Sequence, residues 1–202
     1  VRAGGGDVAA IREAAGVVPG EPMTGVDPRQ VAEAVAALPS VASAEVHRSW
    51  PGTVAVSVTP RELALAVPAV GGGWLAVGPD GVVVEQRDEV PPGLAGLGGF
   101  EVRGAPGDEL PGELRPAAAV AGALGPGLVD RLVHLELGDA TTVLALLGDG
   151  GAVVFDGGAT PAELSAAAAA ALAVLETVPS GCTDRLDVTS SQTPVLRRSA
   201  AC

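Results

Sequence analysis

The sequence contains no lysine and no tyrosine, and only four aromatic residues and two cysteines occur among its 202 residues. We attribute these gaps to a coding bias toward Ala, Gly, Arg, Pro and Val. Two cysteines are too few for a tetrahedral zinc site of their own or for a disulfide framework. Cys182 and Cys202 are therefore expected either as two unpaired thiols near the C-terminus or as one bridge.

Long hydrophobic runs are also missing. The longest apolar run, Ala166 to Leu175, is about half of the roughly 20 residues that a membrane-spanning helix needs. We expect no spanning segment and, because no basic segment precedes an apolar one at the start, no signal peptide within this stretch. Hydrophobic residues nevertheless make up 48% of the chain, which excludes wholesale disorder.

Positive charge is scarce. The chain has twelve arginines and 24 acidic residues, so its formal net charge is −12. A chain of this charge is repelled by phosphate backbones and by anionic lipid surfaces. The sequence therefore predicts no nucleic-acid partner.

Recognisable catalytic and ligand-binding motifs are absent as well. His47 and His134 fall in predicted strands without further ligands at metal spacing. No Gly-x-Ser-x-Gly motif occurs, and the glycine clusters at 4–6 and 71–73 lack the surroundings of a phosphate-binding loop. We expect no catalytic residue, no metal and no cofactor.

Two helices and a hairpin are predicted in the first third of the chain. Residues 8–15 carry apolar positions on one helical face, and a second helix begins after Asp27 with Pro28 at its first position. From Val41 the apolar period changes to two, which predicts strands over 41–50 and 53–58 around a Pro-Gly turn. A short strand or arm is expected at 1–3.

The remaining sequence has the pattern of a larger sheet. Alternating or apolar runs bounded by turn residues predict strands at 74–77, 82–85, 133–137, 141–147, 152–155 and 186–188. Helices are expected at 114–124 and after Thr160, where Pro161 and Glu163 complete a capping box. We interpret this part as an antiparallel sheet with helices on one side.

Several motifs resemble one family. Arg48-Ser49-Trp50-Pro51 follows Leu38-Pro39-Ser40-Val41 at a specific spacing, and Gly78-Pro79-Asp80-Gly81 and Leu186-Asp187-Val188 come later in the chain. Together they resemble the extracytoplasmic region of the FtsQ/DivIB cell-division proteins, from an actinobacterium to judge by composition. The resemblance covers nearly the whole chain.

The resemblance implies an α+β fold of two parts. A POTRA domain, two helices on a small mixed sheet, is expected at 1–66. An FtsQ-type antiparallel-sheet β domain with helices on one side is expected at 67–191, and a C-terminal tail at 192–202.

The resemblance also implies a non-catalytic divisome scaffold at the septum, on the extracytoplasmic face of the cell membrane. The family's spanning helix would precede Val1. FtsB/DivIC-like and FtsL-like proteins are the expected partners at the C-terminal edge strand. The matching positions are Asp187, Val188, Thr189, Ser190, Ser191, Val195 and Leu196.

Other divisome proteins are expected to dock on the POTRA domain around Arg48, Trp50 and Pro51. Two alternatives remain. One is a POTRA-containing chaperone of an outer-membrane assembly or secretion system, although no series of barrel strands follows here. The other is an unrecognised secreted enzyme.

Overall fold

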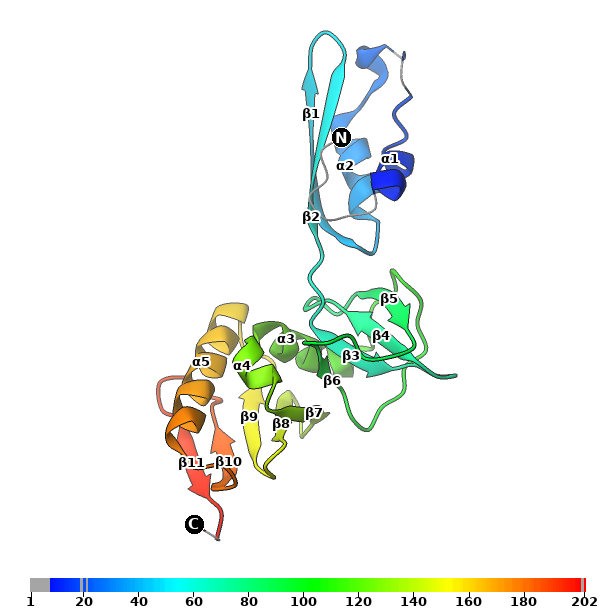
Figure 1. The fold of residues 1–202 in the computed structure, drawn as a ribbon. Helices are drawn as coiled ribbons and strands as arrows, with labels where there is room; N and C mark the ends of the chain where they lie inside the picture. The colour runs from blue at the N-terminus through cyan, green and yellow to red at the C-terminus, as the bar shows by residue number, and fades with distance from the viewer. Residues whose placement is uncertain (1–7, 19, 21, 201) are drawn as a thin grey trace. The chain divides into compact units, whose positions relative to one another are not determined.

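The computed structural model describes residues 8–18, 20, 22–200 and 202 (Figure 1). The strand expected at 1–3 lies outside these residues. The chain divides into two compact units, Val1–Glu62 and Leu63–Cys202. The division falls earlier than the boundary expected at residue 66, because Leu65 and Ala66 already pair with strand residues of the second unit.

The first unit contains two helices, one 3-10 turn and one hairpin. Its elements are α1 (Val8–Ala15), η1 (Met23–Gly25), α2 (Pro28–Ala36), β1 (Val41–Ser49) and β2 (Thr53–Pro60). Asp27 caps α2 by accepting a hydrogen bond from the Arg29 N–H at 2.9 Å, and Pro28 fits the first turn, which needs no N–H.

The core of the first unit is small. β1 and β2 pair antiparallel from Val41 opposite Pro60 to Ser49 opposite Thr53. The two helices pack on this hairpin with six buried side chains: Ile11, Val26, Val31, Val35, Val41 and Val56. Most other hairpin positions are half-buried or exposed.

The second unit contains a four-stranded and a five-stranded sheet. The first sheet has the order β5-β4-β3-β6 and consists of β3 (Leu65–Pro68), β4 (Trp74–Val77), β5 (Val83–Arg87) and β6 (Ala95–Gly96). Leu97 bridges to Leu135 of the other sheet, and the Gly98 N–H donates to the Leu135 carbonyl at 2.8 Å. The two sheets therefore share one hydrophobic core.

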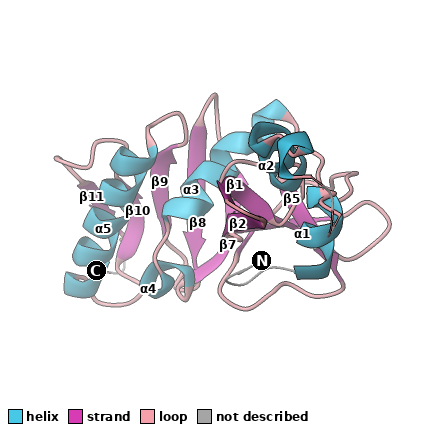
Figure 2. Ribbon diagram, turned by 90° about the horizontal axis from the view of Figure 1, so that it is seen from above, coloured by secondary structure: helices cyan, strands magenta, loops and turns pink. Residues whose placement is uncertain are grey.

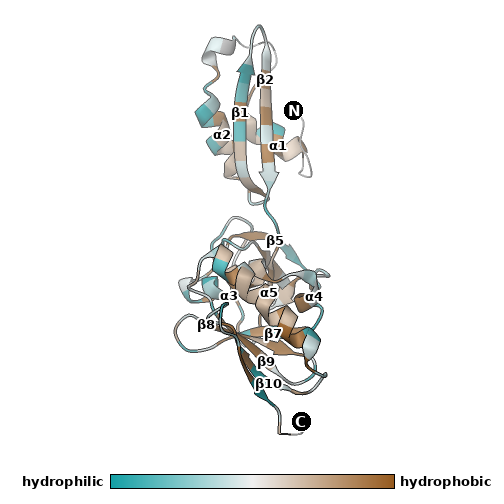
Figure 3. Ribbon diagram, turned by 90° about the vertical axis from the view of Figure 1, so that its left-hand side faces the viewer, coloured by the Kyte–Doolittle hydropathy of each residue, from teal (hydrophilic) through white to brown (hydrophobic). Residues whose placement is uncertain are grey.

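The five-stranded sheet has the order β11-β10-β9-β8-β7. It consists of β7 (Leu132–Leu137), β8 (Thr142–Leu147), β9 (Ala152–Asp156), β10 (Thr183–Asp187) and β11 (Val195–Arg198). In Figure 3 the ribbon changes from brown near β7 to teal at β10, so the C-terminal end of this sheet is its hydrophilic end.

Helices cover one face of this sheet. They are η2 (Gly112–Leu114), α3 (Arg115–Ala123), α4 (Pro126–Val129) and α5 (Pro161–Thr177). α3, α4 and α5 lie above the strands in Figure 3, and α3 runs beside α5 in Figure 2. Thr160 and Glu163 form the predicted capping box at the start of α5. The predicted α+β fold is confirmed.

Two parallel pairings depart from the simple antiparallel expectation. β3 pairs parallel with β6, and β9 pairs parallel with β10. The second pairing follows from α5, which crosses over the sheet between β9 and β10, since only a crossover can join neighbouring parallel strands. The expected tail at 192–202 contains β11, which pairs antiparallel with β10.

Candidate functional site

The C-terminal end of the five-stranded sheet contains the residues at which the family resemblance implies a partner site. β10 lies between β9 and β11 in this sheet, and β11 has a single strand neighbour among the described residues. Asp187 pairs with Val154 on one side and Val195 on the other. The edge of the sheet is therefore β11 and not the strand that ends at Asp187.

Val188 lies in the core. Its side chain is 1% exposed and its backbone N–H donates to the Val154 carbonyl at 3.0 Å. A partner could not reach this N–H without opening the sheet. Among the expected partner-binding positions, Val188 therefore supports the fold of the edge and is not part of its surface.

The loop after β10 is held by its own hydrogen bonds. The Asp187 carboxylate accepts from the Thr189 N–H at 3.1 Å and from the Thr189 hydroxyl at 2.7 Å. The Thr193 N–H donates to the Ser190 carbonyl, and the two hydroxyls lie 3.1 Å apart. Thr189 and Ser190 are exposed, and Ser191 is half-buried. This loop sets the register in which the chain returns as β11.

β11 offers a mixed surface. Val195 is 64% exposed, whereas Leu196 is half-buried and packs against the core. Arg197 donates through Nε to the Asp184 carboxylate, and Arg198 is exposed. The expected positions Val195 and Leu196 thus do lie on the edge strand, together with two arginines that the sequence pattern did not single out.

A disulfide closes the open end of the β10–β11 hairpin. Cys182 and Cys202 are bonded, with their Cα atoms 5.5 Å apart. The Ser199 N–H donates to the Cys182 carbonyl at 3.0 Å beside this bridge. Of the two states that the sequence left open, the structure has the bridged one.

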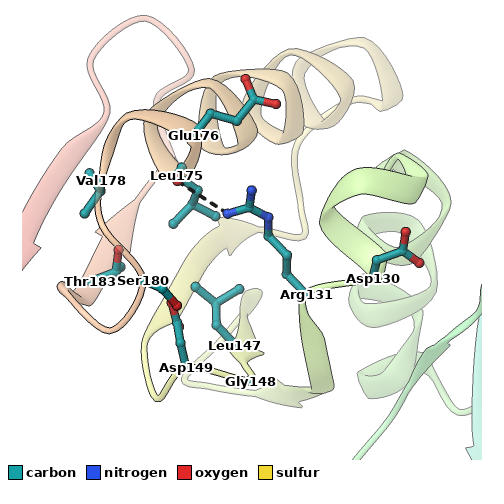
Figure 4. Close-up of a pocket in the computed structure, with 10 residues that line it drawn as sticks. All are labelled: Asp130, Arg131, Leu147, Gly148, Asp149, Leu175, Glu176, Val178, Ser180 and Thr183. Atoms are coloured by element: carbon teal, nitrogen blue, oxygen red, sulfur yellow. Dashed lines mark hydrogen bonds between the residues drawn. The ribbon is translucent and has the colours of Figure 1, made fainter.

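A pocket of about 610 Å³ lies between the end of α5 and the β8–β9 turn (Figure 4). Within it, Arg131 donates to the Leu175 carbonyl at 3.3 Å. Asp149 accepts from the Gly181 N–H at 3.0 Å and from the Ser180 hydroxyl at 3.3 Å. The Gly181 N–H, with help from Gly151 and Ser180, lowers the pKa of Asp149.

Asp149 has a structural role in this pocket. It ties the β8–β9 turn to the loop that leads through Cys182 into β10. These two hydrogen bonds therefore hold the start of β10, the strand next to the edge, against the β8–β9 turn.

The second expected docking region lies in the first unit. Arg48 donates to the Val26 carbonyl at 2.9 Å, so it braces the segment before α2. Trp50 is 71% exposed. Trp50 and Pro51 line a largely apolar hollow of about 820 Å³ together with valines 17, 18, 26, 54 and 56. The structure thus places two of these three residues on one open surface.

Across the described part of the chain, His, Cys, Asp and Glu form no group of three or more that could hold a metal ion. His134 contacts Glu136 at 2.9 Å, and His47 lies 3.8 Å from Glu45. Within the same residues, every helix is too short or too polar to cross a membrane.

Comparison with known proteins shows which family this chain resembles. The family model "POTRA domain, FtsQ-type" matches residues 7–61. A cell division protein FtsQ from Corynebacterium glutamicum is 30% identical over 144 residues, which cover 69% of this chain and 61% of the relative. The chain carries an FtsQ-type POTRA domain and is similar over most of its length to the FtsQ cell-division proteins.

A second FtsQ, from Streptomyces collinus, is 30% identical over 158 residues, or 73% of this chain and 58% of the relative. A third, from Streptomyces bingchenggensis, is 36% identical over 85 residues, or 42% of this chain and 32% of the relative. The chain thus spans about three fifths of the length of the first two relatives it matches. The predicted resemblance and the POTRA domain are confirmed.

The sequence pattern placed Arg197 and Arg198 in a tail, whereas the structure places both on the edge strand β11. The sequence feature that could have predicted this strand is the apolar pair Val195-Leu196 directly before two arginines, in a part of the chain that contains few cations. Such a short run after Pro194 is typical of a tail as much as of a strand. Only its pairing with β10 distinguishes the two.

Proposed function

We propose that this chain is a non-catalytic scaffold that links early and late cell-division proteins at the septum. It recruits FtsB/DivIC-like and FtsL-like partners by strand addition to β11. The observation that carries this proposal is the position of β11 at the edge of the five-stranded sheet, with one strand neighbour among the described residues. A strand edge provides affinity through backbone hydrogen bonds and specificity through alternate side chains.

The location proposed for this activity is the extracytoplasmic face of the cell membrane, reached by a spanning helix outside this chain. The Cys182–Cys202 bridge supports that placement. Disulfides persist in oxidising compartments and are rare in the reducing cytosol.

The open surface around Trp50 and Pro51 is proposed as a second docking site for other divisome components. A large exposed tryptophan beside an apolar hollow has the composition of an interface centre, since aromatic residues dominate binding energy there. Arg48 is assigned a supporting role, because its guanidinium is engaged with Val26.

A proline pair on β11 tests the strand-addition proposal. Successive N–H groups of a strand point to opposite sides, so Arg197→Pro and Arg198→Pro remove one N–H that faces β10 and one that faces outward. The outward-facing proline should keep the fold and abolish binding of the extracytoplasmic segment of an FtsB-like protein from the same organism. Binding is measured by calorimetric titration and folding by circular dichroism.

Arg197→Ala and Arg198→Ala are the matched controls, since they remove the same side chains and keep both N–H groups. Strand addition at β11 would be overturned if both proline variants fold correctly and each binds the FtsB-like segment as tightly as the alanine variant at the same position. Truncation before β10 is a poorer test, because it would remove the buried residues Leu186 and Val188.

A further inference from the structure

The second unit is strongly acidic, but its edge strand is cationic. Residues 63–202 contain 17 acidic residues and seven arginines, a net charge of −10. Three of these arginines, Arg185, Arg197 and Arg198, lie on β10 and β11. A cationic strand in an acidic domain concentrates attraction for an anion at one place.

The strand registers place two of these arginines side by side. Arg185 pairs directly with Arg197, so both side chains lie on one face of the sheet. Leu186, the neighbour of Arg185, is buried in the core, so the arginine pair lies on the opposite, exposed face of the hairpin. Like charges directly opposite each other in a ladder destabilise it.

The nearby carboxylates leave this charge only partly compensated. Asp184 accepts from Arg197, and Asp187 accepts from Thr189. Arg185 and Arg198 form no ion pair with any residue that the structure describes. The hairpin therefore presents more positive charge than its own residues neutralise.

β11 is also divided along its length. Its first half, Val195 and Leu196, is apolar, and its second half, Arg197 and Arg198, is cationic. A strand added alongside β11 places one of its residues next to each of these four, alternating between the two faces of the sheet. The added strand can satisfy both halves only in one register.

We propose that β11 selects a partner strand in which two apolar residues are followed or preceded by two acidic residues, the acidic pair lying beside Arg197 and Arg198. This inference rests on the proposed strand addition and adds the chemistry and register of the partner. A second copy of this chain does not fit. In a centred antiparallel pair of two β11 strands, Arg197 and Arg198 would face Leu196 and Val195 and stay unneutralised.

Charge reversal tests the selection. Arg197→Glu/Arg198→Glu should weaken binding of the FtsB-like segment about tenfold or more, and added salt should weaken wild-type binding. Arg87→Glu/Arg103→Glu is the matched control, since it makes the same charge change elsewhere in the second unit and should leave binding unchanged. Arg197→Gln/Arg198→Gln, a neutral variant, replaces the reversed one if that fails to fold. Equal binding by the edge and control variants would overturn the proposal.

A pair of synthetic peptides separates this inference from the identity of the partner. One strand-forming peptide carries Val-Val-Glu-Glu and its twin Val-Val-Lys-Lys. The acidic peptide should shift the backbone amide resonances of residues 195–198 and the lysine twin should not. If the FtsB-like segment does not bind but the acidic peptide is still preferred over the lysine peptide, only the proposed identity of the partner is contradicted. Equal shifts by both peptides, or none by either, would contradict the acidic selection.

Discussion

The two units of the chain reach stability by different means. Among its described residues, the first buries six hydrophobic side chains between two short helices and one hairpin. The second buries thirty among its described residues, and a disulfide joins its last two strands. Because small units bury a smaller fraction of their surface, each buried side chain in the first unit carries a larger share of its stability.

Charge separates the units as well. Residues 1–62 contain seven acidic and five basic residues, whereas the second unit has a net charge of −10. The apolar hollow with Trp50 belongs to the nearly balanced unit, and the cationic edge belongs to the acidic one. The two proposed surfaces therefore recognise partners by different physics, hydrophobic burial in one case and charge with backbone pairing in the other.

Ile11→Ala should give the largest effect. Removing this buried side chain costs about 2–5 kcal/mol. That cost approaches the total stability of a unit of this size, at roughly 0.05–0.15 kcal/mol per residue. We expect the first unit to unfold while the second keeps its amide spectrum. Leu164→Ala, a similar loss in α5, should leave the second unit folded. Parallel loss of both units in Ile11→Ala would show that they do not fold independently.

Removing the disulfide tests the same comparison by destabilising the second unit. The bridge joins cysteines 20 residues apart, and closing a loop of this length contributes about 3 kcal/mol. Cys182→Ser/Cys202→Ser should lower the unfolding midpoint of the second unit and leave that of the first unchanged. A denaturant titration monitored by the amide spectra measures the unfolding midpoint of each unit separately. An unchanged midpoint in the second unit would contradict a stabilising role for the bridge.

Helix caps provide the same change in both units. Asp27→Ala and Thr160→Ala each remove a side-chain acceptor at a helix start and should each cost about 1 kcal/mol. The fractional fall in the unfolding midpoint should be greater for the first unit, since the same loss is a larger share of its smaller free energy of unfolding. Asp27→Asn and Thr160→Ser keep an acceptor and serve as controls. Equal fractional shifts would contradict the difference in stability between the units.

Asp149 should give the smallest effect, and only in acid. Its pKa is lowered in the folded state, chiefly by the Gly181 N–H. The stabilisation is therefore complete above the ordinary aspartate pKa of about 4 and is lost as pH falls through the lower folded value. Asp149→Asn should flatten this part of the stability profile of the second unit. A variant profile with the wild-type slope would exclude Asp149 as its source.

Local structure followed the sequence closely. Asp27 and Pro28 begin α2, Thr160 begins α5 with its capping box, and the apolar run predicted as a strand at 141–147 forms β8. In each case neighbouring residues decide the outcome, through a cap or through a period of burial. The α+β fold class rested on these short-range signals together with the family resemblance.

Long-range pairing could not be predicted in this way. β6 is two residues long and exists because Ala95 and Gly96 pair with β3. β11 is short and follows a proline, and only its pairing with β10 and the disulfide mark it as part of the sheet. For the candidate site, the family resemblance pointed to residues between Asp187 and Leu196, but the sequence could not distinguish the buried Val188 from the exposed edge at Val195.

The disulfide has a mechanical consequence for the strand addition proposed at β11. Cys182 precedes β10 and Cys202 follows β11, so the two strands and their loop form a covalent ring. A load applied through β11 cannot peel this strand from its Arg198 end one hydrogen bond after another, because the bridge holds that end to the start of β10. Instead, the pull must shear the whole ladder at once or draw β10 from the middle of the sheet.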